Sequence, residues 1–283
     1  MRRPDGKRPL SFWFLTAFFV LFVLFLYGPM MAIYILSFQG PTGGLTFPMR
    51  GVSLVWFDAL FGQQRTGDFS GSFWRSIVLA LTAMALTLVI SVSAGLAFRR
   101  RFRGSTLLFY VAIASLVMPG LFVGLGIALA FQVAGLTPRW WLSGLGAHLT
   151  WTLPFGLLIM FAVFNRFNRA YEEAARDLGA TGWQTLTQVF LPILAPGLIA
   201  VALFGFTLSY DEFARSVLTV GAHNTLPLEI YAMTTSVTSP ALFALGTVTT
   251  AFSFAVIALA LTSMALIQRR RSRISSSKEA GHP

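Results

Sequence analysis

The amino-acid sequence predicts an all-α polytopic membrane protein with six transmembrane helices and cytoplasmic N- and C-termini. Of its 283 residues, 55% are hydrophobic and only 11% are charged, whereas a soluble domain carries about 25% charged residues. The charged residues leave six long gaps between them, and these span residues 9–49, 76–98, 104–138, 140–165, 178–210 and 230–268. Crossing a hydrocarbon core about 30 Å thick takes about 20 apolar residues, so each gap can hold one helix. This pattern excludes a soluble enzyme, a secreted disulfide scaffold and a disordered chain.

The basic residues predict the orientation of these helices. If six spans alternate, segments 1–11, 99–104, 165–191 and 268–283 share one side and contain sixteen of the 21 Lys and Arg residues. Such an excess marks the cytoplasmic side. The net charge of +11 is divided among short clusters between apolar runs. Because no continuous basic face results, we expect membrane lipid and no nucleic acid as a partner.

The N-terminal quarter begins with a basic cytoplasmic segment, 1–11, followed by the first transmembrane helix, 12–36. Its apolar run of 25 residues exceeds the 7–15 or so of a signal peptide, so a retained helix is predicted. Residues 37–72 form a periplasmic loop that contains apolar and aromatic residues at 54–57 and 60–61. A short helix at the membrane interface and an ordinary packed loop are both compatible with them.

Residues 73–267 are predicted to form a five-helix core, followed by a disordered cytoplasmic tail, 268–283. The expected helices of the core are 73–98, 105–131, 147–164, 193–213 and 241–267. The tail contains Ser275-Ser276-Ser277 and no apolar periodicity, which is typical of disorder.

Prolines predict breaks within these helices, since each removes a backbone donor. The clearest is Pro119-Gly120; the others are Pro29, Pro154 and Pro196. Gly120 and Gly124 form a small-xxx-small pattern that permits close helix approach. We favour helix packing for these glycines over the alternative that they line a substrate path.

Covalent catalysis is not expected. The chain has no cysteine, and no span contains a carboxylate pair or an H-E-x-x-H metal motif. An intramembrane hydrolase would need a nucleophile and a base facing each other; Ser143 and His148 are the only nearby pair to consider, and His148 is expected at a helix end. We therefore predict neither catalytic nor metal-ligating residues.

The loop 165–192 contains a predicted helix–turn–helix. Apolar residues at 171, 174, 175 and 178 follow i, i+3, i+4, i+7 and form one stripe. Glu172 and Arg176 are a favourable i, i+4 pair, and Gly179 can close the helix with a positive φ. Such a short helix is marginal in water without a partner.

A second helix is predicted to start at Thr181-x-x-Gln184, which fits a capping box. We expect Pro192 to end it.

The spacing within this loop resembles the EAA loop of ABC importer permeases. Their pattern E-A-A-x3-G-x9-I-x-L-P matches Glu173-Ala174-Ala175, Gly179 and Val189-Phe190-Leu191-Pro192, with Val189 for Ile as the only departure. The resemblance implies an importer-permease (MetI-like) architecture. It also implies that the loop couples the membrane helices to an ATPase through Glu173, Ala174, Ala175, Gly179, Leu191 and Pro192.

Further expectations follow from this resemblance. The chain has no Walker motif, so ATP and Mg would be bound by a partner ATPase and this chain would bind no cofactor. The implied partners are a second permease subunit in a heterodimer, two cytoplasmic ATPase subunits and a periplasmic solute-binding protein. The implied location is the bacterial inner membrane. A stand-alone secondary transporter is the alternative; it would need coupling-ion groups at mid-bilayer and no ATPase.

Two further stretches, 206–213 and 225–233, resemble the second permease subunit of spermidine/putrescine transporters. The resemblance implies a polyamine as solute, although related importers of opines, aminophosphonates and other small solutes share much of it. Asp211 and Glu212 lie near the outer end of the fifth predicted span, where they could attract a cation; alternatively, they end the helix or pair with Arg215. Tyr210 and Trp151 are candidates for cation–π contacts with an amine.

Overall fold

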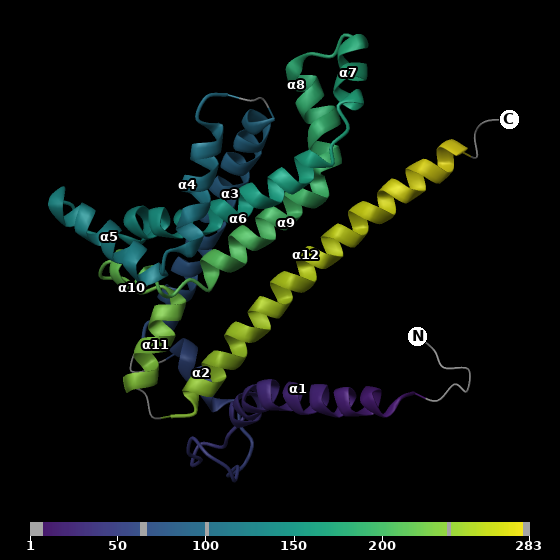
Figure 1. Ribbon diagram of the computed structural model, residues 1–283. Helices are drawn as coiled ribbons and strands as arrows, with labels where there is room; N and C mark the ends of the chain where they lie inside the picture. Colours follow the sequence, from purple (N-terminus) through teal and green to yellow (C-terminus); the bar gives the residue numbers. More distant parts are fainter. Residues whose placement is uncertain (1–7, 63–66, 100–101, 237–238, 280–283) are drawn as a thin grey trace. The chain divides into compact units, whose positions relative to one another are not determined.

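The computed structural model describes residues 8–62, 67–99, 102–236 and 239–279. Throughout these ranges the regular structure is helical, apart from one isolated antiparallel bridge between Gln39 and Val52. The chain divides into two compact units, which are described separately: one comprises Met1–Gly67 with Ala232–Phe252, and the other Asp68–Tyr231 with Ser253–Pro283 (Figure 1). The predicted all-α class is confirmed for the described part of the chain.

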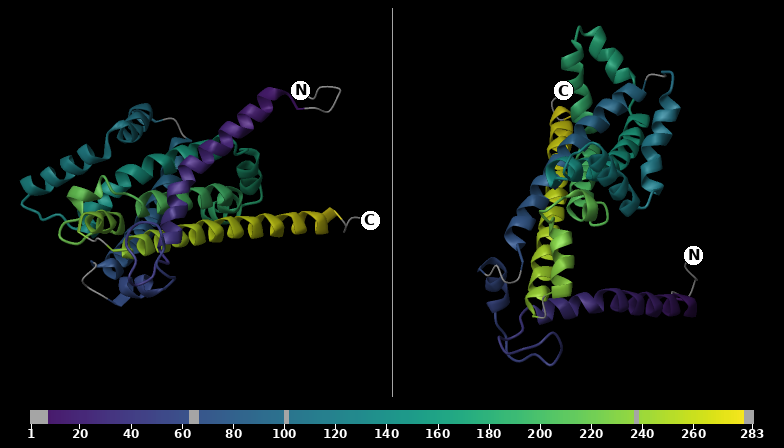
Figure 2. Two further views of the ribbon diagram at one scale, coloured as in Figure 1. Left: turned by 90° about the horizontal axis from the view of Figure 1, so that it is seen from below. Right: turned by 90° about the vertical axis from the view of Figure 1, so that its left-hand side faces the viewer.

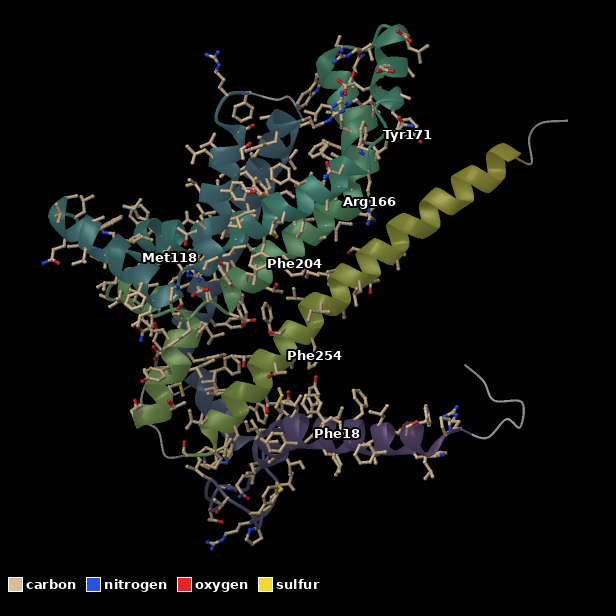
Figure 3. All side chains as sticks on the ribbon, in the orientation of Figure 1. Phe18, Met118, Arg166, Tyr171, Phe204 and Phe254 are labelled. Carbon is tan, nitrogen blue, oxygen red and sulfur yellow. The ribbon has the colours of Figure 1, made fainter. Side chains whose placement is uncertain are left out.

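The first unit contains α1 (Leu10–Leu36) and α2 (Val55–Gly62), together with the end of α11 (Leu226–Ser236) and the start of α12 (Ala241–Glu279). No residue in the most apolar window of α1 is buried within the structure, and Phe18 points away from the helix axis in Figure 3. At 1.5 Å per residue, α1 is about 40 Å long. A helix this long and apolar on all sides is suited to contact lipid.

The segment between α1 and α2 is folded around Gln39. The Gln39 side chain donates to the carbonyl of Gly44 at 3.2 Å and accepts from the backbone nitrogen of Arg50 at 2.7 Å. Its own carbonyl accepts from the indole of Trp56 at 2.9 Å. Of the two alternatives for this region, a short helix is present, and it is α2.

The second unit is organised by three long helices that contact one another, α3 (Phe69–Phe98), α6 (Leu145–Asn165) and α9 (Leu191–Tyr210) (Figure 1). Glycines allow the close approach: a Cβ on Gly95 would collide with the ring of Phe164, and one on Gly156 with Ser91. The buried core between these helices comprises Met160, Phe164, Phe190, Leu194 and Val201. Small residues at the contacts are typical of helix packing in membranes.

The expected span 105–131 is broken into two helices. Helix α4 (Ser105–Val117) and helix α5 (Gly120–Val133) meet at an angle of 109°. Met118, which precedes Pro119, is extended with ψ of 128°. Proline disfavours the helical conformation of the residue before it and cannot donate the next hydrogen bond. The predicted break at Pro119 is therefore confirmed, whereas no break occurs at Pro29, Pro154 or Pro196, which lie within the continuous helices α1, α6 and α9.

In the described ranges, five helices are long and apolar enough to cross a membrane, or six if the bent pair counts as one span. The tail was expected to be disordered from residue 268, but α12 continues to Glu279. The expectation was therefore wrong for residues 268–279. Between residues 268 and 279 the sequence has neither Gly nor Pro, and nothing in its backbone chemistry forces the helix to end. Residues 280–283 and 1–7 lie outside the described ranges.

Candidate functional site

The EAA loop, residues 165–192, folds as predicted into two helices joined by a tight turn. Helix α7 (Ala170–Asp177) closes at Gly179, whose φ is +77° and whose nitrogen donates to the carbonyl of Arg176 at 2.8 Å. A glycine is favoured there because other side chains strain at positive φ. The expected capping box is present: Thr181 and Gln184 each accept from the other's backbone nitrogen. Figure 2 shows these helices at one end of α6 and α9.

Large apolar side chains of this loop are exposed. Tyr171, Leu178 and Trp183 have 54%, 88% and 72% of their surface accessible; Tyr171 is labelled in Figure 3. Within the predicted stripe only Ala175 is buried. Exposed aromatic and aliphatic side chains on a charged helix are typical of a surface that binds another protein.

The charged side chains of the loop are divided between paired and exposed positions. Glu172 accepts from Arg176 at 2.6 Å, which confirms the predicted i, i+4 pair, and from Arg99 at 2.9 Å. Glu173 is exposed. A cavity of about 590 Å³ lies beside them, lined by Leu96, Ala97, Arg99, Arg169, Glu172, Glu173, Arg176 and Phe190.

Pro192 does not end the second helix, contrary to expectation. Short helix α8 (Gly182–Gln184) leads into a π-helical segment, η3 (Thr185–Phe190), and then directly into α9 at Leu191. Pro192 thus stands in the first turn of α9, where a missing backbone donor is tolerated. The loop is consequently continuous with a membrane helix, a connection that a local reading of proline did not predict.

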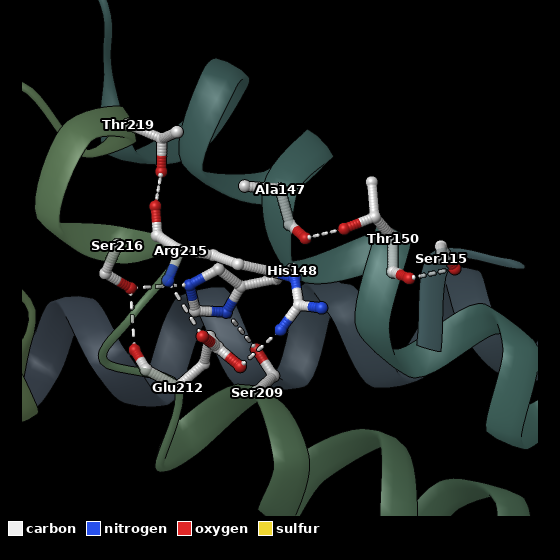
Figure 4. Close-up of polar contacts among 9 residues, drawn as sticks. All are labelled: Ser115, Ala147, His148, Thr150, Ser209, Glu212, Arg215, Ser216 and Thr219. Atoms are coloured by element: carbon white, nitrogen blue, oxygen red, sulfur yellow. Dashed lines mark hydrogen bonds and ion pairs between the residues drawn. The ribbon is translucent and has the colours of Figure 1, made fainter. Parts of the chain in front are cut away.

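A second polar site is a buried cluster at the end of α9, shown in Figure 4. Glu212 and Arg215 are both buried and form an ion pair of 3.2 Å, and the Glu212 side chain also accepts from the backbone nitrogen of Arg215 at 2.9 Å. The guanidinium carbon lies 4.5 Å from the ring centre of Trp151. Glu212 and Trp151 therefore lie near each other, as expected of two residues at one site, but both contact Arg215 of this chain. Of the alternatives for Glu212, pairing with Arg215 is the one observed.

His148 and two serines complete the buried cluster, which we define as His148, Trp151, Ser209, Glu212, Arg215 and Ser216. The two ring nitrogens of His148 lie 2.8 Å from the Ser209 hydroxyl and 2.9 Å from the Ser216 hydroxyl. His148 is the fourth residue of α6, near a helix end as expected, and it is 1% exposed. Ser143 instead bonds to the carbonyl of Thr219 at 2.7 Å. The pair considered for a hydrolase, Ser143 and His148, therefore does not form a nucleophile and base.

Two glycines of α5, Gly120 and Gly124, pack against this cluster. A Cβ on Gly120 would lie 3.1 Å from a guanidinium nitrogen of Arg215, and one on Gly124 would lie 2.9 Å from its carbonyl oxygen. The favoured interpretation, helix packing, agrees with these distances. Arg215 is the residue whose central place sequence reasoning missed; its position three residues after Glu212 was the available indication.

The remaining two residues expected along a solute path, Tyr210 and Asp211, take no part in the ion pair. Asp211 follows the last residue of α9 and is exposed. Tyr210 is buried, and its ring stacks on Phe206 with centroids 5.8 Å apart. The four expected path residues therefore do not share one open site in this structure.

Apolar helices of membrane-spanning length, interrupted by an exposed helix–turn–helix, define a polytopic membrane protein as the class of this protein. A family model described as "Binding-protein-dependent transport system inner membrane component" matches residues 88–274, and the chain belongs to that family. The chain is accordingly a multi-pass inner-membrane permease of an ABC importer and not an enzyme.

Curated relatives agree with this family. The chain is 28% identical over 250 residues to the spermidine/putrescine transport system permease protein PotC of Haemophilus influenzae, covering 88% of this chain and 95% of the relative. It is 29% identical over 231 residues to the putrescine transport system permease protein PotI of Escherichia coli, covering 79% and 80%. Similarity to the second permease subunit of polyamine systems is thereby confirmed.

Solved structures confirm the importer-permease fold. A crystal structure of a bacterial ABC transporter involved in the import of the acidic polysaccharide alginate matches with a TM-score of 0.60 and 16% identity, covering 94% of this chain and 98% of that one. The alginate transporter in complex with its pentasaccharide-bound periplasmic protein matches with a TM-score of 0.61 and 15% identity, covering 92% and 94%.

Proposed function

We propose that this chain is one of two permease subunits that carry a polyamine, spermidine or putrescine, into the bacterial cytoplasm at the expense of ATP. The relatives PotC and PotI, named for these solutes, match most of the chain and support the solute class. The exposed EAA loop, which offers large apolar side chains to a partner, supports the ATP-driven mechanism.

In this proposal both termini and the EAA loop lie in the cytoplasm, and the segment 37–72 lies in the periplasm. Two ATPase subunits bind ATP and Mg, a second, different permease subunit forms the other wall of the path, and a periplasmic binding protein delivers the solute. When ATP draws the ATPases together, the EAA loop moves, and α9 moves with it because η3 joins them without a break.

The proposed coupling residues have different roles: some would contact the ATPase, and others lie where the loop joins α9. Glu173, Ala174 and Gly179 are exposed and would contact the ATPase; Ala175 is buried and holds α7 in place. Leu191 and Pro192 lie where the loop becomes α9 and would transmit its movement.

Among the residues expected along the solute path, Asp211 is the one we retain as a contact for an amine. It is exposed, and a carboxylate attracts a polyamine cation. Glu212 and Trp151 already hold Arg215, and Tyr210 is buried, so we assign these three to the packing beside the path.

The test of the proposal is Leu178→Lys. Leu178 is 88% exposed at the end of α7, where a positive charge suits the helix dipole, so the subunit should fold normally. Losing a buried leucine contact costs about 1.5–3 kcal/mol, and co-purification of the ATPase should therefore fall about tenfold or more. Uptake of labelled putrescine into cells should fall with it.

Val52→Lys is the matched control, because Val52 is an equally exposed aliphatic residue in the segment 37–72. It should leave the yield of the ATPase unchanged. Undiminished ATPase binding by Leu178→Lys would show that the loop docks elsewhere or not at all.

A further inference from the structure

Arg99 links α3 to the EAA loop. It follows the last residue of α3, and its guanidinium lies 2.9 Å from a carboxylate oxygen of Glu172 in α7. The loop is joined along the chain to α6 and α9, whereas α3 ends about 70 residues before it. A movement of α7 therefore reaches α3 only through non-covalent contacts such as this pair.

Three aromatic rings surround the same guanidinium. Its central carbon lies 5.8 Å from the ring centre of Phe164, 5.2 Å from Phe167 and 4.9 Å from Phe190. Phe167 and Phe190 stack on each other with centroids 4.7 Å apart. Arginine suits this position because its planar group stacks on rings while it donates to a carboxylate. Arg99 thus contacts the end of α6, the end of η3 and α7 at once.

Shielding distinguishes this ion pair from its neighbour. The side chains of Arg99 and Glu172 are 17% and 21% exposed, whereas Arg176, the other partner of Glu172, is 62% exposed. An exposed pair is screened by water and contributes little, and a shielded pair holds its geometry more firmly. The link between α3 and α7 is therefore stiffer than the pair within α7.

We propose that Arg99 is a positioning residue that transmits the movement of the EAA loop to α3. As α7 moves, Glu172 draws the guanidinium of Arg99 with it. Because the guanidinium also contacts the rings of Phe164, Phe167 and Phe190, the ends of α6 and η3 move together with α7. All three helices of the central bundle then respond together. This inference rests on the proposed function and adds the route by which α3 joins the movement.

A purely structural role makes a different prediction. If Arg99 only stabilises the fold, its loss lowers the amount of assembled transporter but leaves the transport per ATP hydrolysed unchanged. If Arg99 transmits movement, the assembled transporter hydrolyses ATP and transports less solute for each ATP. The ratio of uptake to hydrolysis therefore separates the two roles.

The experiment uses the complete transporter in proteoliposomes, with labelled putrescine as the probe. We expect Arg99→Gln and Glu172→Gln each to lower uptake per ATP about tenfold, within the range of typical coupling energies. The double variant should be no worse than the more severe single one, because both remove the same link. Arg99→Lys keeps the charge and loses the planar stacking, so it should lower uptake per ATP by less than Arg99→Gln does.

Arg103→Gln is the matched control, since Arg103 is an exposed basic residue of the same connection between α3 and α4. It should keep the wild-type ratio. Wild-type uptake per ATP in Arg99→Gln, or a double variant whose loss is the product of the single losses, would overturn the inference. If the transporter with Arg99→Gln does not assemble, the uptake per ATP of the Glu172→Gln transporter tests the inference instead. Failure of the wild-type transporter to import putrescine would count against the proposed solute and not against the link.

Discussion

The EAA loop and the buried cluster place their charges in opposite environments. In the loop, Glu173 is exposed, and Arg176, although paired with Glu172, is 62% exposed. In the cluster, Glu212 and Arg215 are both buried and form an ion pair, with Trp151 covering the guanidinium. Charges that face outward are available to a partner, whereas a charge that is paired inside the fold is costly to leave without its partner.

This contrast separates two kinds of acidic residue that look alike in the sequence. Glu172-Glu173 and Asp211-Glu212 are both pairs of neighbouring carboxylates beside a basic residue. One member of each pair is held by arginine and the other is exposed. Substitutions at the held members should disturb contacts within the subunit, and substitutions at the exposed members should test contacts with partners or solute.

The largest effect is expected in the buried cluster. Arg215→Met leaves Glu212 buried without its ion-pair partner, which should lower the free energy of unfolding by about 3–5 kcal/mol. Glu172→Gln, in the loop, should lower it by less, because the side chain of Glu172 is 21% exposed and that of Glu212 only 7%. Thermal unfolding of the purified subunit in detergent measures the difference.

The double variant Glu212→Gln with Arg215→Met provides the control for this prediction. It removes both charges, so part of the lost stability should return. Equal destabilisation by Arg215→Met and Glu172→Gln would show that the two regions do not differ as the burial indicates.

Two glycines of α5 give the next largest effect. Gly124→Ala places a methyl group 2.9 Å from the carbonyl oxygen of Arg215, and such overpacking costs about 1–3 kcal/mol. Gly126→Ala, on the same helix, meets no atom within 4 Å and should raise stability by up to about 1 kcal/mol through helix propensity. The midpoints of thermal unfolding should therefore shift in opposite directions.

A lowered midpoint for both glycine variants would contradict the close packing of α5 on Arg215. Both variants leave every charge of the cluster in place, so the comparison tests packing alone.

Sequence reasoning predicted the elements that depend on local chemistry. The charge-free gaps located the spans, Pro119 located the break, and Gly179 with the Thr181 capping box located the turn of the EAA loop. Each of these follows from a backbone donor, a positive φ or a side-chain cap within a few residues.

The features it missed depend on contacts between distant residues or on geometry that no single residue determines. Proline marks a break but does not set the 109° angle between α4 and α5, which depends on how α5 packs against Arg215. Likewise, Arg99 lies in a basic cluster that indicated only orientation, and its contact with Glu172 joins positions far apart in the chain. The turn after Tyr210 decides that Glu212 faces inward and Asp211 outward.

The smallest expected effect is at Asp211, the exposed neighbour of buried Glu212. Asp211→Asn should leave the unfolding midpoint unchanged, because this side chain is exposed and no ion pair is recorded for it among the described residues. It should raise the KM for putrescine uptake by no more than about fivefold, since a solvated ion pair is worth up to about 1 kcal/mol. The rise should shrink at high ionic strength, where such attraction is screened.

Asp58→Asn is the control for this last change, because it also removes one exposed carboxylate, in α2. Its KM should remain that of the wild type. A KM unchanged by Asp211→Asn at low ionic strength would remove Asp211 from the solute path. The buried cluster would then stand purely as a structural element, because its own carboxylate, Glu212, is already neutralised by Arg215.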